Sequence, residues 1–207
     1  MEDRRKESIY FNLLFQRHPE LLPLQEKVWD SYELLREVYR SQGKLLICGN
    51  GGSAADADHI VGELMKGFLK KRELPEEKTL LFGELARGLQ GALPAIALTQ
   101  HGALSTAYMN DAEPSMIFAQ QVYGYGKPED ALLAISTSGN SLNVNNAVKV
   151  AKKCGIRIIG MTGKDGGLVR RLADLCITVP ESETAYVQEE HIAVYHTLCA
   201  MLEEYFF

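Results

Sequence analysis

The chain has 207 residues, of which 46% are hydrophobic and 24% charged, and its formal net charge is −5. These values are ordinary for a soluble domain and give no reason to expect a nucleic-acid or membrane surface. No run approaches the roughly 20 apolar residues of a membrane span, and the opening MEDRRKESIY lacks the apolar region of a secretory signal. We therefore expect a cytoplasmic protein without nucleic-acid or membrane partners.

The first part of the chain, residues 1–42, is predicted to be helical. Apolar and aromatic side chains recur at helical spacing from Val28 to Tyr39, and Pro19 and Pro23 indicate a break before them. This segment is expected to serve packing or oligomerisation.

Short apolar strands then alternate with helices. Strands are expected at 44–48, 94–98, 131–135, 157–161 and 175–179, and helices at 54–68, 142–153, around 170 and at 184–204. Near-continuous apolar strands separated by helices indicate a parallel sheet that is covered on both faces. The predicted fold class is α/β, with one domain over residues 1–207 in a three-layer, Rossmann-like sandwich.

Residues 69–93 interrupt this rhythm, since they are first highly charged and then more helix-like. We interpret them as an insertion within the domain rather than a domain of their own. The four cysteines are scattered and never form CxxC, so they are expected to be reduced, buried packing residues. They are Cys48, Cys154, Cys176 and Cys199.

Two strands end in loops of small, hydroxyl-bearing residues, Gly49–Ser53 and Ser136–Ser141, each followed at once by a helix. Helix N-termini present unpaired N–H groups and bind phosphate without lysine. In an open parallel sheet both loops lie at the carboxyl edge, where ligands bind. Ser53 and Ser141 could instead be simple helix N-caps, but this leaves the other hydroxyls of the second loop unexplained. We predict a phosphate site.

A nucleotide site is the rival interpretation of the first loop, because Gly49-x-Gly51-x-x-Ala54 formally matches the dinucleotide fingerprint. That fingerprint needs a second strand ending in an acidic residue about 20 residues further on. Residues 69–78 stand there and are charged rather than strand-like, and no GxxxxGK[ST] is present. We expect no nucleotide cofactor.

Four segments together resemble the signature blocks of bacterial sedoheptulose-7-phosphate isomerases, which are built on the sugar-isomerase (SIS) domain. The segments are Cys48–Leu64, Ile135–Ser141, Thr162–Gly167 and Val187–His196. The resemblance extends from residue 43 to the C-terminus. It implies a flavodoxin-like sandwich, homotetramers, active sites shared between subunits and a sugar-phosphate substrate.

The resemblance also implies roles for individual residues. Glu63 and His196 would be the acid/base pair. His59, Glu63, Gln188 and His196 match a zinc site reported in some members, which gives one zinc ion per subunit. The substrate-binding residues predicted from the loops and the resemblance are Asn50, Gly51, Gly52, Ser53, Asp111, Ser136, Thr137, Ser138, Ser141 and Gln188.

The chain departs from the family pattern at two places. Ala185 stands where the family has an aspartate, and residues 69–93 are absent from the short members. Both departures bear on the identity of the sugar more than on the chemistry.

Isomerisation of an aldose to a ketose moves a proton between C1 and C2 through an enediol, so it needs a base and a proton donor. His59 and Glu63 are four residues apart and share a helix face, and Gln188 and His196 share a broad face of another helix. Two such helices would bring these groups into one pocket, with or without a metal.

Alternatives remain open for these residues and for the function. His59 and Glu63 taken alone could be a surface pair, and His196 taken alone a packing residue, which is how we interpret His191. The functional alternatives are isomerisation of another sugar phosphate and a non-catalytic phosphosugar-binding regulator of the replication-initiator-associated type. The presence of both Glu63 and His196 favours an enzyme.

Overall fold

The computed structural model describes residues 4–207, and side chains from residue 6 onward. Its centre is a parallel sheet in the order β2-β1-β3-β4-β5. The strands are β1 (Leu45–Cys48), β2 (Ala95–Ala97), β3 (Ala131–Ile135), β4 (Arg157–Thr162) and β5 (Leu175–Thr178). The predicted α/β class and all five expected strands are confirmed, with ends that differ by at most one residue.

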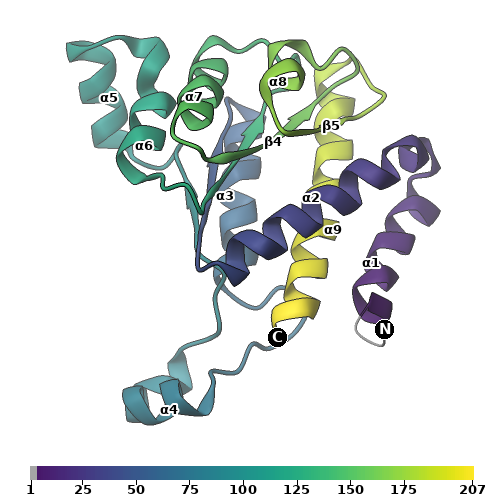
Figure 1. The fold of residues 1–207 in the computed structure, drawn as a ribbon, viewed down its shortest axis with the longest axis vertical. Helices are drawn as coiled ribbons and strands as arrows, with labels where there is room; N and C mark the ends of the chain where they lie inside the picture. Colours follow the sequence, from purple (N-terminus) through teal and green to yellow (C-terminus); the bar gives the residue numbers. More distant parts are fainter. Residues whose placement is uncertain (1–3) are drawn as a thin grey trace.

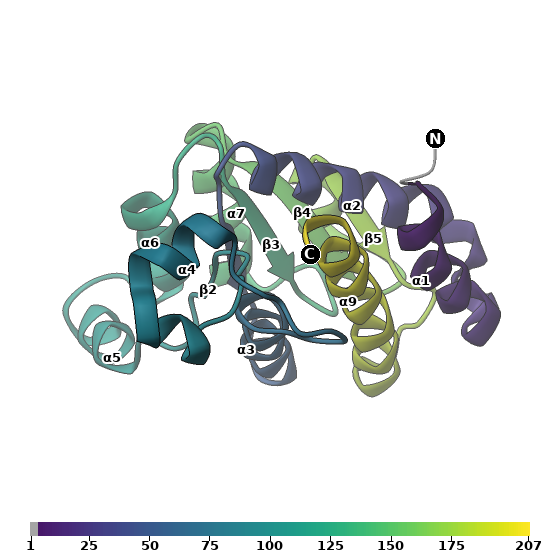
Figure 2. The same ribbon diagram turned by 90° about the horizontal axis from the view of Figure 1, so that it is seen from below.

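Helices cover both faces of the sheet (Figures 1 and 2). One layer holds α1 (Arg4–Arg17), α2 (Gln25–Arg40), α3 (Gly52–Met65) and α9 (Thr184–Phe206), and the other holds α6 (Ile117–Tyr125), α7 (Leu142–Lys153) and α8 (Gly167–Leu172). Successive strand side chains point to opposite faces, so Leu45 and Ile47 join the first core while Leu46 and Cys48 join the second. The remaining helical elements are α4 (Glu76–Phe82), α5 (Gly102–Asp111), and the 3-10 segments Pro19–Leu24, Gly83–Gly88 and Pro114–Met116.

The boundary between β1 and β3 fixes where the site lies. The chain leaves β1 for β2 on one side and returns to β3 on the other, which makes this boundary the switch point of the sheet. Cys48 pairs with Ala134 there. The loops that follow the two strands therefore begin side by side.

Helix α3 was predicted to run to Phe68 but ends at Met65. The N–H groups of Phe68 and Leu69 donate to the Glu203 carboxylate at 2.7 Å instead of to carbonyls of the preceding turn. A long-range acceptor thus ends the helix. Helices α5 and α6 were not assigned from the sequence.

The cysteine prediction holds only in part. All four are free, and Cys48 and Cys199 are buried, which raises the pKa of each thiol to about 12. Cys154, at the C-terminus of α7, and Cys176, on the edge strand β5, are only half-buried.

No helix within residues 4–207 combines the length and the apolar character needed to cross a bilayer.

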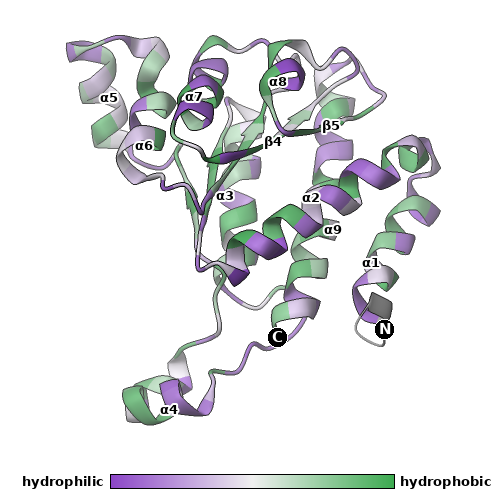
Figure 3. Ribbon diagram, viewed as in Figure 1, coloured by the Kyte–Doolittle hydropathy of each residue, from purple (hydrophilic) through white to green (hydrophobic). Residues whose placement is uncertain are grey.

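The predicted insertion forms an arm, which we define as residues 73–90. It carries α4 and stands away from the sheet (Figure 1), and no side chain of α4 or of the following 3-10 segment is buried. Apolar residues lie on it in the open (Figure 3), with Leu80 76% exposed and Leu85 74% exposed.

Candidate active site

The loops after β1 and β3 are joined to each other at the switch point. The side-chain amides of Asn50 and Asn143 exchange two hydrogen bonds of 2.9 Å each. Gly51 has a φ of 57°, a backbone conformation that glycine adopts readily, and α3 begins at the next residue. The predicted convergence of the two loops is therefore present.

The N-cap interpretation is wrong for Ser53 and holds for Ser141 by position alone. Ser53 is the second residue of α3 and is buried, while Gly51 holds the N-cap position. Ser141 does hold the N-cap position of α7, but its side chain makes no capping bond and lies 3.1 Å from the Ser136 hydroxyl. Ser53 and Ala54 donate their N–H groups to the Asn50 and Gly51 carbonyls, and the Val144 N–H donates to Asn143 Oδ1. Among the described residues, the first-turn N–H groups that remain for another acceptor are those of Gly52, Leu142 and Asn143.

The second loop is held in place by contacts with residues 166–169. Gly139 has a φ of 66°, and a side chain there would lie 2.1 Å from the carbonyl oxygen of Gly166. Leu168 and Val169 donate backbone hydrogen bonds of 2.9 and 3.0 Å to the Gly139 carbonyl. Ser138 remains exposed, and its Oγ accepts only a 3.2 Å bond from the Asn140 N–H. The loop therefore offers fixed N–H groups and an accessible hydroxyl.

Helices α3 and α9 bring the predicted acid/base residues together. His59 Nε2 lies 3.1 Å from Glu63 Oε1 and 3.4 Å from His196 Nε2. The Tyr195 hydroxyl lies 3.1 Å from His59 Nδ1 and donates to Asp56 Oδ1 at 3.3 Å. His59 and Glu63 are thus more than an isolated surface pair, because α9 meets both sides of the imidazole.

Burial shifts the pKa of three groups in this cluster, those of His196, Asp56 and Tyr195. It lowers the pKa of His196, the nearby His59 lowers that pKa further, and Glu63 opposes the shift. Burial also raises the pKa of the Asp56 carboxyl, and burial and the Asp56 charge raise that of the Tyr195 phenol. At neutral pH His196 is therefore neutral and can donate one N–H.

Two predicted site residues lie apart from this cluster. A methyl group on Gly52 would lie 2.3 Å from Gln188 Nε2, so the Gln188 amide fills the space at the start of α3. Eight residues, or about 12 Å of helix, separate it from His196. Asp111 is exposed at the end of α5, with a hydrogen bond of 2.8 Å from its neighbour Asn110.

The predicted zinc ligands are accordingly not assembled in a single chain. His59, Glu63 and His196 lie together, whereas Gln188 lies at the other end of the helix pair. Among residues 4–207, no three His, Cys, Asp or Glu side chains are placed so that they could hold a metal ion.

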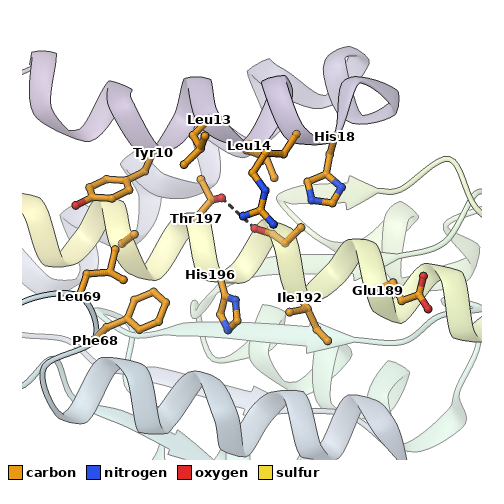
Figure 4. A pocket seen from close by; sticks show the side chains of 13 residues that line it. Tyr10, Leu13, Leu14, His18, Phe68, Leu69, Glu189, Ile192, His196 and Thr197 are labelled. Carbon is orange, nitrogen blue, oxygen red and sulfur yellow. Dashed lines mark hydrogen bonds between the residues drawn. The ribbon is translucent and has the colours of Figure 1, made fainter.

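A cavity of about 440 Å³ opens beside the acid/base cluster, between α1 and α9 (Figure 4). His196 and Phe68 form one wall, with ring centroids 5.4 Å apart. Its other lining residues are Tyr10, Leu13, Leu14, Arg17, His18, Leu69, Glu189, Ile192, Ala193, Thr197 and Ala200. The loops at the switch point contribute no residue to this cavity.

Sequence reasoning missed several residues of the site. Asp56 shares a helical face with His59 and Glu63, so the spacing could have indicated it. Tyr195 was hidden within an apolar helix, and nothing in the charged stretch from 69 to 78 indicated that Arg72 is buried. His191 is fully buried, as expected for a packing residue, and burial lowers its pKa to about 4.

Comparison with known proteins agrees with this arrangement. The SIS domain family matches residues 23–163. The phosphoheptose isomerase of Rhodospirillum rubrum is 42% identical over 165 residues, which cover 80% of this chain and 78% of that protein. That of Nitratiruptor is 41% identical over 189 residues, covering 87% and 91%.

Solved structures give the same result. The phosphoheptose isomerase of Neisseria gonorrhoeae superposes with a TM-score of 0.75 at 33% identity, over 97% of this chain and 98% of that one. The enzyme from Francisella tularensis gives 0.74 at 31% identity, over 95% of each chain. The chain therefore belongs to the SIS-domain family of phosphoheptose isomerases.

Proposed function

We propose that this protein interconverts the aldose and ketose forms of a sugar phosphate, and that the substrate is sedoheptulose 7-phosphate. The observation that carries the proposal is the contact of His59 with both Glu63 and His196, in a chain whose switch point joins two hydroxyl-bearing loops. The names of the curated relatives support the seven-carbon substrate.

The chemistry follows from the proposed roles. The phosphate is held by N–H groups and hydroxyls of the loops at 50–53 and 136–141. Glu63 removes the proton from the carbon next to the carbonyl, and the electron pair forms the enediol double bond while His196 donates a proton to the carbonyl oxygen. His196 then takes the proton of the neighbouring hydroxyl, and Glu63 returns its proton to the other carbon.

The proposal is tested by NMR of the protein with five-, six- and seven-carbon sugar phosphates in deuterated water. Conversion of the seven-carbon ketose, with solvent deuterium entering at C1 or C2, is the expected result. Conversion of a shorter sugar alone would correct the substrate. Saturable binding without conversion or exchange would instead identify a phosphosugar-binding regulator.

We also propose a cytoplasmic homotetramer with shared active sites. The loops at the switch point do not line the cavity beside His196, and the arm leaves apolar side chains uncovered. The free cysteines are those expected of a reducing compartment.

Shared sites predict complementation between two variants that are each inactive when the substrate concentration is well below the KM of the serine variant. A Ser136→Ala, Ser138→Ala double variant, coexpressed with a His196→Asn variant, should regain about a quarter of the parent's activity, because random assembly pairs an intact loop with an intact histidine in that share of sites. Native mass spectrometry gives the subunit number. A monomer, or mixed oligomers without recovered activity, would contradict shared sites.

Zinc binding at His59, Glu63, Gln188 and His196 remains a prediction, with one ion per subunit. A bound zinc ion would act as a Lewis acid toward the sugar carbonyl. If the set assembles, Gln188→Ala should lower the zinc content measured by elemental analysis, and a chelator should lower activity. Gln25→Ala, at an exposed glutamine that begins α2, is the control and should leave the zinc content unchanged. A metal-free protein with full, chelator-insensitive activity would contradict the prediction.

A further inference from the structure

A buried ion pair ties the ends of the two helices that carry the proposed acid/base residues. Arg72 is 0% exposed and Glu203 is 1% exposed, and Arg72 Nε donates to Glu203 Oε1 at 2.8 Å. Burying two charges is costly unless both are fully hydrogen bonded. Both side chains of this pair make further hydrogen bonds, and these lie at the end of α3 and in the segment that follows it.

Arg72 caps the C-terminus of α3. Its two terminal nitrogens donate to the carbonyls of Leu64 and Glu63, at 2.6 and 2.7 Å. These are carbonyls of the last helical turn, which have no partner within the helix. The planar guanidinium can reach both carbonyls and the carboxylate at once, which the compact ammonium of lysine cannot. One of the two carbonyls belongs to Glu63 itself.

Glu203 holds the segment that leaves α3. Its carboxylate accepts the N–H groups of Phe68, Leu69 and Lys70, at 2.7, 2.7 and 3.2 Å. Burial alone would raise the pKa of Glu203, but the N–H groups of Phe68 and Leu69 together with Arg72 lower it below its ordinary value. Phe68, fixed in this way, presents its ring to the His196 imidazole at 5.4 Å.

The two ends of the pair therefore reach both proposed acid/base residues. Glu203 follows His196 by seven residues, which places both on one face of α9, two turns apart. Arg72 bonds to the backbone of Glu63 on α3. We propose that Arg72 and Glu203 are positioning residues, which set the placement of Glu63 against His196 for the isomerisation. This inference rests on the proposed function.

A second buried ion pair provides a matched control. Asp130 is 1% exposed, pairs with Lys44 Nζ at 2.6 Å, and also accepts the N–H groups of Lys44 and Lys127. Lys44 and Asp130 immediately precede β1 and β3, so they lie at the amino edge of the sheet, opposite the loops. Asp130→Asn disturbs a similar carboxylate without touching the helix pair.

The experiment compares Arg72→Lys, Glu203→Gln and Asp130→Asn with the parent. We expect the two positioning variants to lower kcat about ten- to a hundredfold, since small misplacements of reacting groups have effects of this size. The KM should change less than about threefold, because the loops that bind phosphate are untouched. Asp130→Asn should lower the Tm to a similar degree and leave kcat within about twofold of the parent.

Positioning variants that lose stability but keep the parent's kcat would show a purely structural role and overturn the proposal. Phe68→Leu removes the ring contact with His196 without burying an unpaired charge, so it provides a second test if the other variants fail to fold; an unchanged kcat there would also count against the proposal.

Failure of the proposed function is recognised separately, as a parent protein without isomerase activity. In that case the imidazole NMR signals of His59 and His196, assigned from single His→Asn variants, test the inference. They should shift in Arg72→Lys and stay in place in Asp130→Asn. Unchanged signals in both would overturn the positioning role.

Discussion

Replacing Glu63 with glutamine is expected to lower kcat about a hundred- to ten-thousandfold, the usual contribution of a positioned acid or base. Glutamine keeps the size of the side chain but cannot accept the proton from carbon. Since the loops at 50–53 and 136–141 are untouched, the Kd for the sugar phosphate, measured by calorimetry, should stay within about threefold. Deuterium exchange at C1 and C2 should be lost together with turnover.

Glu73→Gln is the control for this variant, because Glu73 is exposed on the arm and should leave kcat unchanged. Retention of the parent's kcat in Glu63→Gln would remove Glu63 from the mechanism. A raised Kd with normal kcat would assign it to substrate binding instead.

The second large effect is expected at the loop after β3. Ser138→Ala removes an exposed hydroxyl donor to the phosphate, and a hydrogen bond to a charged group contributes about 1.5–3 kcal/mol. Affinity should therefore fall roughly tenfold to a hundredfold for the sugar phosphate and for inorganic phosphate alike. Ser136→Ala should have a similar effect. It also removes the hydrogen-bond partner of the Ser141 hydroxyl, which lies 3.1 Å from the Ser136 hydroxyl.

Ser41→Ala is the matched control, since Ser41 is an exposed serine at the end of α2, before the amino edge of the sheet. Calorimetric titration with both ligands gives the comparison. Unchanged affinity in Ser136→Ala and Ser138→Ala would mean that phosphate is bound elsewhere.

Much of the fold could be predicted because its signals are local. The run from Ala131 to Ile135 is buried on both faces, so it is apolar throughout and its ends are clear in the sequence. The end of α3 was not predictable in this way. It depends on Glu203, which is 135 residues away from Phe68 along the chain.

The candidate site could also be predicted only where its signals are local. Its two loops were predictable, because glycines and hydroxyls after a strand have a direct physical meaning. The separation of Gln188 from His196 could not be predicted. Helical periodicity shows that two residues share a face of a helix, but it does not show which other residues pack against each of them. Arg72 looked like one more solvated charge, and its burial is explained only by its three acceptors, the carbonyls of Glu63 and Leu64 and the carboxylate of Glu203, 131 residues away.

The exposed leucines of the arm also have a consequence for handling the protein. Leu80, Leu81 and Leu85 are 69–76% exposed, and no other part of the chain that the structure describes covers them. Uncovered apolar helices promote aggregation, whereas flanking charges act as gatekeepers against it. Glu76, Glu77, Lys78, Glu84 and Arg87 surround these leucines. Solubility of the isolated subunit should therefore depend on ionic strength and protein concentration, and neutralising these charges should make it precipitate more readily.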